Sequence, residues 1–240
     1  MLLVIPMAGR GSRYADKGFE RPKPLIEVAG KPMLQHAFRS VSQLRYRKVV
    51  FVALKEHEEA YDLHRIIREE VVREFELVLL DDITEGQLCT VLEASGHFQE
   101  GEGLLIAASD SYVALDRMQE DIDQRYFEGL ISVIELPGEQ WSFAKTDEQG
   151  RVIEVAEKQR ISDWASTGVY YFSDAKVFQQ EAEQLIAAKE TTKGEYYVMP
   201  LYNRYLVKDR PVGISKAAAM WDMGTPEAKR MFEEYLKNRP

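Results

Sequence analysis

The chain has 240 residues, 45% of them hydrophobic, and its 40 acidic and 31 basic side chains give a formal net charge of −9. An acidic chain with no basic stripe argues against a nucleic-acid partner, and a single cysteine, Cys89, excludes an internal disulfide and a cysteine-based zinc site. The apolar run at 2–5 stops at Pro6, which is typical of a strand rather than a signal peptide. No run approaches the roughly 18 apolar residues of a membrane span. We therefore expect a soluble cytoplasmic protein without a membrane partner.

The first half of the chain alternates short apolar runs with helical patterns. Apolar spacing predicts helices at 32–44, 56–72 and 87–97, and the runs predict strands at 2–5, 49–53, 77–80 and 104–107. This βαβα order predicts an α/β fold with a Rossmann-like, mostly parallel central sheet flanked by helices. In such a sheet, ligands bind at the carboxyl ends of the strands.

The second half has a different pattern, with short connections between apolar runs. Four strands are predicted at 130–134, 141–144, 152–155 and 168–172, with a hairpin turn at 147–150. We expect them to form a smaller antiparallel substrate-binding layer, followed by helices at 174–188, 197–207 and 226–238. The chain is predicted to be one domain, 1–240, with a nucleotide-binding half at 1–128 and an acceptor-binding half at 129–240. The aromatic C-terminal half is compatible with a homodimer.

The loop after the first strand carries the strongest functional signal. Gly9 and Gly11 let backbone N–H groups approach an anion, and Arg10, Arg13 and Lys23 supply positive charge to the same loop. This pattern lacks the third glycine of a dinucleotide fingerprint and the Gly-Lys-Ser/Thr of a P-loop. A glycine pair alone is often an exposed turn, but together with these cations it predicts a polyphosphate-binding loop.

The segment Gly9-x-Gly-x-Arg13, followed by Pro22-Lys-Pro24, resembles the N-terminal signature of the sugar-phosphate nucleotidyltransferases, which include nucleoside-diphosphate-sugar pyrophosphorylases and cytidylyltransferase-like enzymes. The resemblance implies a GT-A-like nucleotidyltransferase fold and a Mg²⁺-dependent reaction. In that reaction an NTP and a small phosphorylated acceptor give a nucleotide-linked product and pyrophosphate. It also implies catalytic roles for Arg13, at the leaving pyrophosphate, and Lys23, at the α-phosphate. The implied nucleotide-binding residues are Met7, Ala8, Gly9, Gly11, Ser12 and Gly86.

Two aspartates are candidate magnesium ligands. Asp110 follows the predicted strand at 104–107, where a turn or cap aspartate is equally common, and the resemblance assigns it to the metal although Ser109 stands where the family usually has glycine. Asp222 begins Asp-Met-Gly-Thr-Pro, which matches the family's Asp-x-Gly-Thr-Pro motif. Its local alternative is a helix cap, and Thr225 is expected to cap the helix that begins at Pro226.

The acceptor is assigned by resemblance to Glu157, Lys158 and Gly168. In isolation the Glu-Lys pair would be an ordinary surface ion pair. The segment 84–90, where relatives bind the base, lacks a common Gly-Thr-Ala form, so CTP, UTP and dTTP all stay open. Sugar-1-phosphates are the first acceptor class, and a CTP-dependent enzyme for phosphocholine, a polyol phosphate or a phosphonate is the alternative. A glycosyltransferase, which needs Asp-x-Asp, and a non-catalytic nucleotide sensor are more remote.

Overall fold

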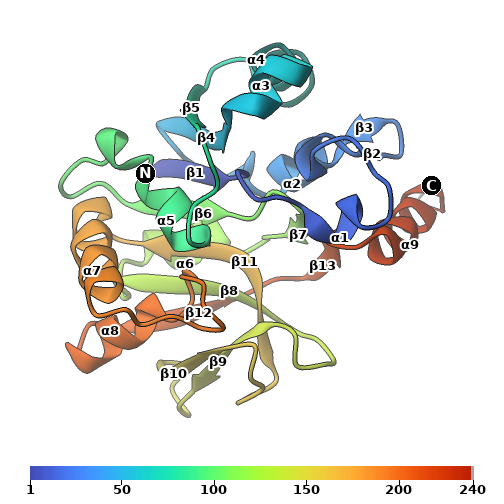
Figure 1. Ribbon diagram of the computed structural model, residues 1–240. Coiled ribbons are helices and arrows are strands. Elements are labelled where there is room, and N and C mark those ends of the chain that lie inside the picture. Colours follow the sequence, from blue (N-terminus) through green and yellow to red (C-terminus); the bar gives the residue numbers. More distant parts are fainter. Residues whose placement is uncertain (239–240) are drawn as a thin grey trace.

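The computed structural model describes residues 1–238, and in this range nine strands form one mixed sheet (Figure 1). Its parallel part has β1 at the centre, paired with β4 on one side and β6 on the other, and β5 pairs with β4. The bounds are β1 (Leu2–Pro6), β4 (Lys48–Leu54), β5 (Glu76–Leu80) and β6 (Leu104–Ala107). All four strands predicted for the first half are therefore present.

The antiparallel part continues the same sheet, because β11 pairs with β6. β11 also pairs antiparallel with β8 and β9, and β9 forms a hairpin with β10 through the predicted turn at 147–150. β12 is added in parallel to β8. The bounds are β8 (Gly129–Glu135), β9 (Ser142–Thr146), β10 (Val152–Glu157), β11 (Trp164–Phe172) and β12 (Val212–Lys216). The predicted fold class is confirmed, and the two kinds of pairing share one sheet.

Strand alternation directs side chains to two cores, one on each face of the sheet. Leu2 and Val4 pack in a cluster with side chains of α5, α7 and α8, whereas Leu3 and Ile5 pack with side chains of α2 and α6. The bounds are α2 (Met33–Val41), α5 (Gln87–Leu92), α6 (Met118–Asp123), α7 (Ala175–Ala187) and α8 (Leu201–Val207). Among residues 1–238, no helix has the length and apolar character needed to cross a membrane.

Three predicted helices are shorter or more broken than the apolar spacing suggested. The helix predicted at 56–72 is interrupted at Asp62, whose backbone is left-handed and whose side chain caps the next turn by accepting from the Arg65 N–H. It becomes α3 (Lys55–Tyr61), α4 (Leu63–Ile66) and a π turn, Ile67–Val71. The helix predicted at 87–97 ends at Leu92, before a 3₁₀ turn, Ser95–His97. The one predicted at 197–207 begins only after Pro200, since proline disfavours helix in the residue before it.

Short elements complete the fold around the carboxyl end of β1. A hairpin, β2 (Glu27–Val28) and β3 (Lys31–Pro32), precedes α2, so Pro32 ends a strand instead of opening the predicted helix. A separate two-stranded sheet joins β7 (Ser111–Ala114) to β13 (Ala219–Asp222). The remaining elements are α1 (Ser12–Ala15), the 3₁₀ turn Lys23–Leu25 and α9 (Pro226–Lys237), which Thr225 caps as predicted.

The aromatic packing between β11 and α8 gives a direct test of the core. Phe172 is 0% exposed, its ring is stacked on Tyr202 with centroids 4.5 Å apart, and Phe178 lies 4.8 Å away. Phe172→Ala should therefore lower the free energy of unfolding by about 3–5 kcal/mol in a urea titration. Val207→Ala, at a position 85% exposed, should stay within about 0.5 kcal/mol of the wild type. A loss below about 1 kcal/mol for Phe172→Ala would contradict this packing.

Candidate active site

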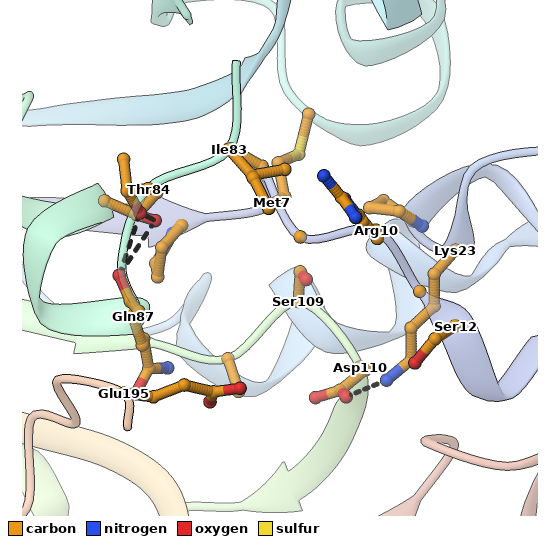
Figure 2. Close-up of a pocket in the computed structure, with 18 of the residues that line it drawn as sticks. Met7, Arg10, Ser12, Lys23, Ile83, Thr84, Gln87, Ser109, Asp110 and Glu195 are labelled. Carbon is orange, nitrogen blue, oxygen red and sulfur yellow. Dashed lines mark hydrogen bonds and ion pairs between the residues drawn. The ribbon is translucent and has the colours of Figure 1, made fainter. Parts of the chain in front are cut away.

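A cavity of about 620 Å³ lies where β1 and β6 end at their carboxyl termini. Several separate segments line it, and Figure 2 shows their side chains converging from opposite sides. The lining comprises 6–13, 23–24, 83–87, Thr90, 108–110, 194–195 and Gly224. Nine of the thirteen residues predicted from the sequence are among them: Met7, Ala8, Gly9, Gly11, Ser12, Arg13, Lys23, Gly86 and Asp110.

The glycine loop leaves β1 and turns sharply into the one-turn helix α1. Gly11 has φ 61°, in the left-handed region, and a Cβ there would lie 3.0 Å from the Cβ of Lys23. Gly9 has open space where a Cβ would stand. The loop therefore packs closely against Lys23 at Gly11 and leaves its backbone accessible to the cavity at Gly9, as an anion-binding loop requires.

Lys23 and Asp110 form an ion pair at the wall of the cavity, drawn as a dashed line in Figure 2. Their side chains are only 14% and 24% exposed. Burial by itself would raise the pKa of Asp110, but the Lys23 ammonium and its hydrogen bond outweigh this effect and hold that pKa below its ordinary value. Asp110 is thus held as a carboxylate inside the site.

Asp222 is held near Asp110 by the small sheet formed by β7 and β13. Asp222 lies opposite Ser111, and the Met223 N–H donates to the Asp110 carbonyl oxygen at 2.8 Å. Burial, and next the negative charge of Asp110, raise the pKa of Asp222. Two carboxylates 112 positions apart in the sequence are therefore brought close enough to repel each other, although Asp222 is not part of the cavity lining.

The donor set formed by Asp110 and Asp222 fits Mg²⁺. Carboxylate oxygens are hard ligands, and Mg²⁺ in phosphate-transfer sites is commonly held by one or two carboxylates together with substrate phosphates. Within residues 1–238, no group of three or more His, Cys, Asp or Glu side chains is placed to hold a metal ion. A cation between this pair would relieve its repulsion, and Lys23 now offsets that charge from the Asp110 side.

The second wall of the cavity is built by two segments bonded to each other. The Tyr196 N–H donates to the Glu85 carbonyl oxygen at 2.9 Å, and the Leu88 N–H donates to the Tyr196 carbonyl oxygen at 3.0 Å. Gly86 lies between them with φ 142°, and a Cβ there would be 2.4 Å from the Tyr196 carbonyl oxygen. Only glycine fits this backbone and this contact.

The three predicted acceptor residues lie beside the cavity rather than in its lining. Lys158 donates from Nζ to the Tyr197 hydroxyl, which donates to the carboxylate of Glu195 in the cavity wall. Glu157 accepts from the Ser142 hydroxyl, and burial raises its pKa. Gly168 meets the lining through its backbone, since its carbonyl oxygen accepts from the Ala108 N–H at 3.0 Å. Lys158, through Tyr197, and Gly168 are therefore connected to residues of the cavity lining.

With this geometry established, comparison with known proteins identifies the chain's family. The nucleotidyl transferase family model matches residues 3–237. The chain belongs to the nucleotidyl transferase family. The likeness noted in the sequence to sugar-phosphate nucleotidyltransferases is confirmed.

The structural neighbours of the chain share its fold, and their names point to different substrates. The bifunctional protein GlmU of Methanocaldococcus jannaschii is 26% identical over 98% of the chain, which spans 54% of that protein. The chain thus spans about half the length of the curated relatives it matches. A nucleoside-diphosphate-sugar pyrophosphorylase from Vibrio cholerae RC9 has a TM-score of 0.84 and 26% identity, over 97% of this chain and 99% of that one. The inositol-1-phosphate CTP transferase from T. maritima has a TM-score of 0.78 and 14% identity, over 98% of this chain and 94% of that one, and shows the fold alone.

Several residues that line the cavity were not singled out as site residues from the sequence. Thr84 and Thr90 both direct hydroxyls to the Gly86 carbonyl oxygen, at 2.9 and 3.2 Å, and Gln87 and Glu195 also line the cavity. Thr84 and Thr90 lie four and ten residues past the predicted strand at 77–80, at the two ends of the segment 84–90 that relatives use for the base, so their position could have suggested them. Glu195 carries no signal, because its segment reaches the cavity only by bonding to residues 85–88.

Substitution of Gly86 tests the bonding between these two segments. Gly86→Ala imposes a backbone that alanine avoids and a clash with the Tyr196 carbonyl oxygen, so we expect a loss of about 2 kcal/mol or more in unfolding free energy. Gly101→Ala is the matched control, because Gly101 also has positive φ, 70°, but open space at its Cβ. Thermal or urea unfolding measures both. Equal losses for the two variants would contradict the close contact at Gly86.

Proposed function

We propose that the protein is a Mg²⁺-dependent nucleotidyltransferase that condenses an NTP with a sugar-1-phosphate or a similar small phosphomonoester, releasing pyrophosphate. One observation carries the proposal: the glycine loop, the Lys23 ammonium and the Asp110 carboxylate line one cavity in a chain of this family, and the Asp222 carboxylate lies close enough to Asp110 for the two charges to interact. Binding alone would not need cations and carboxylates arranged around the same polyphosphate. Because the reaction consumes NTP, we propose the cytoplasm as its compartment.

The proposed nucleophile is a phosphate oxygen of the acceptor. Its second pKa is about 6, so it is largely ionised at pH 7 and needs no general base. The described cavity lining is consistent with this, since it includes no histidine or cysteine. Catalysis then depends on holding two polyanions in line and stabilising the charge that builds up during transfer.

We assign a separate role in the reaction to each group of these residues. Backbone N–H groups at Gly9 and Gly11 hold the phosphates, Arg13 stabilises the leaving pyrophosphate, and Lys23 exchanges its partner Asp110 for the α-phosphate. Asp110 and Asp222 would hold Mg²⁺, which when bound supplies positive charge that offsets repulsion between the substrates. The remaining residues proposed for the nucleotide, Met7, Ala8 and Ser12, shape the same loop, while Gly86 and its threonine contacts face the base.

The acceptor is proposed to lie between the glycine loop and the segment around Lys158. The Lys158 ammonium donates to the Tyr197 hydroxyl and lies 4.2 Å from the centre of the Tyr197 ring, and we assign it to the acceptor phosphate. Glu157 and Glu195 offer carboxylates for hydroxyl groups. Gly168 packs closely beside Ala108, since a Cβ there would lie 2.9 Å from the Ala108 Cβ, and its backbone is proposed to face the acceptor.

A CTP-dependent cytidylyltransferase for phosphocholine, a polyol phosphate or a phosphonate is the second candidate. The observation in its favour is the shared fold with the inositol-1-phosphate CTP transferase from T. maritima. No contact in segment 84–90 favours one base over another, so the two candidates differ in substrate and not in the proposed chemistry.

The deciding assay measures pyrophosphate release with Mg²⁺ over a grid of CTP, UTP, dTTP, ATP and GTP against sugar-1-phosphates, phosphocholine, polyol phosphates and 2-aminoethylphosphonate. We expect release for one nucleotide–acceptor pair and none without acceptor. No release from a protein that binds nucleotide would contradict the proposal and favour a nucleotide sensor.

Charge removal tests the assigned roles once the pair is known. Arg13→Ala, Lys23→Ala and Asp110→Ala should each lower kcat by about 10²–10³, because each removes a preorganised charge contact. Arg73→Ala, which removes an exposed guanidinium outside the described cavity lining, is the control and should leave kcat unchanged. A near-normal kcat in a folded variant would exclude that residue from the mechanism.

A further inference from the structure

Tyr14 lies next to the glycine loop and carries a buried hydroxyl. The proposed reaction assigns no role to this hydroxyl. Tyr14 follows Arg13 in α1, is 1% exposed, and packs in the small core cluster with Met223 and Phe232. Its hydroxyl donates to the Met223 carbonyl oxygen at 2.7 Å, a contact between residues 209 positions apart. Burial, and then the charges of Asp222 and Asp110, raise the pKa of Tyr14, so its hydroxyl stays protonated and remains a donor.

The Met223 carbonyl belongs to the peptide unit that holds the Asp222 side chain. A trans peptide is planar and directs its C=O and N–H to opposite sides, and residues 1–238 contain no cis peptide bond. In this unit Tyr14 holds the C=O, and the Gly224 N–H on the other side donates to Oδ1 of Asp222 at 2.9 Å. Fixing the carbonyl therefore fixes the direction of the N–H that orients the carboxylate.

Two further contacts connect the same peptide to the rest of the site. The Met223 N–H donates to the Asp110 carbonyl oxygen at 2.8 Å, so the peptide is anchored to the segment of the other carboxylate. A Cβ built on Gly224 would lie 2.8 Å from Asp222 Oδ1 and 3.3 Å from Arg13 Nη1. The guanidinium of Arg13 and the carboxylate of Asp222 therefore both lie against Gly224.

We propose that Tyr14 is a positioning residue that orients the Asp222 carboxylate through the Met223–Gly224 peptide and thereby sets the affinity of the carboxylate pair for a divalent cation. Without the hydroxyl, a fully buried carbonyl loses its partner, and rotation of the peptide toward another donor would turn the Gly224 N–H away from Asp222. The inference rests on the proposed function, because it assumes that Asp110 and Asp222 hold the metal.

The test is a titration of the full chain with Mn²⁺, for the wild type and for Tyr14→Phe. The electron paramagnetic resonance signal of the free ion measures how much Mn²⁺ is bound. Phenylalanine keeps the ring and its edge contact with Phe19 and removes only the donor. We expect Mn²⁺ affinity to fall about three- to tenfold, the range of one lost hydrogen bond. In the pyrophosphate assay the apparent KM for Mg²⁺ should rise by a similar factor, with a smaller change in kcat at saturating Mg²⁺.

Two comparison variants distinguish a specific effect on the orientation of the Asp222 carboxylate from a general loss of stability. Tyr202→Phe also removes a buried tyrosine hydroxyl from backbone carbonyl oxygens, those of Leu130 and Tyr171, and lies outside the described cavity lining. It should lower the melting temperature and leave Mn²⁺ affinity unchanged. Tyr14→4-aminophenylalanine keeps both the ring and an N–H donor and should restore affinity toward the wild-type value.

The outcomes distinguish the inference from the proposed function. Wild-type affinity in folded Tyr14→Phe, an equal loss in Tyr202→Phe, or no recovery with 4-aminophenylalanine would each overturn the positioning role while leaving the metal site in place. Failure of the wild-type protein to bind Mn²⁺ would overturn the metal site itself, and the inference with it.

Discussion

The parallel pairing of β1 with β6 is the constraint on which the site depends. Their register places Leu2 beside Leu104 and Val4 beside Ile106, so both strands end at the same edge of the sheet. The glycine loop leaves one strand and Asp110 follows the other. The hydrophobic burial of both strands thus fixes the glycine loop and a carboxylate next to each other, at a position where the attraction between opposite charges is strong because water is partly excluded.

Charge balance then explains why the remaining parts converge there. Asp110 and Asp222 repel each other, and Lys23 compensates from one side. Positive charge in the loop would otherwise repel a divalent cation, so a site of this kind needs both carboxylates, and a separate small sheet brings in the second one from the end of the chain. In the proposed mechanism a nucleotide polyphosphate becomes the new partner of Lys23, and a bound divalent cation would take over the compensation of Asp110. The loop, the carboxylates and the proposed substrate are electrostatically interdependent.

The sequence predicted the strands and much of the cavity for different reasons. Runs such as Val49–Ala53 are apolar because both faces of the sheet are covered, and this pattern is visible without a structure. The loop and the two aspartates were found by family motifs. The strands β7 and β13 and the bonding of 194–197 to 85–88 were missed, because each depends on hydrogen bonds between distant segments. The break at Asp62 was missed for a local reason, since its left-handed backbone interrupts a run whose apolar spacing is continuous. Tyr14 gave no sequence signal, since its partner is a backbone carbonyl oxygen 209 positions away.

The central claim is that one cavity binds a polyphosphate on the glycine loop and a divalent cation on the aspartate pair. Crystals grown with Mn²⁺ and inorganic triphosphate test this claim independently of the base and the acceptor, because Mn²⁺ is located by its anomalous scattering. The account predicts an anomalous peak between the carboxylates of Asp110 and Asp222, with phosphate density over Gly9 and Gly11 and Lys23 turned toward it. Manganese bound elsewhere, or triphosphate bound away from this loop, would contradict it.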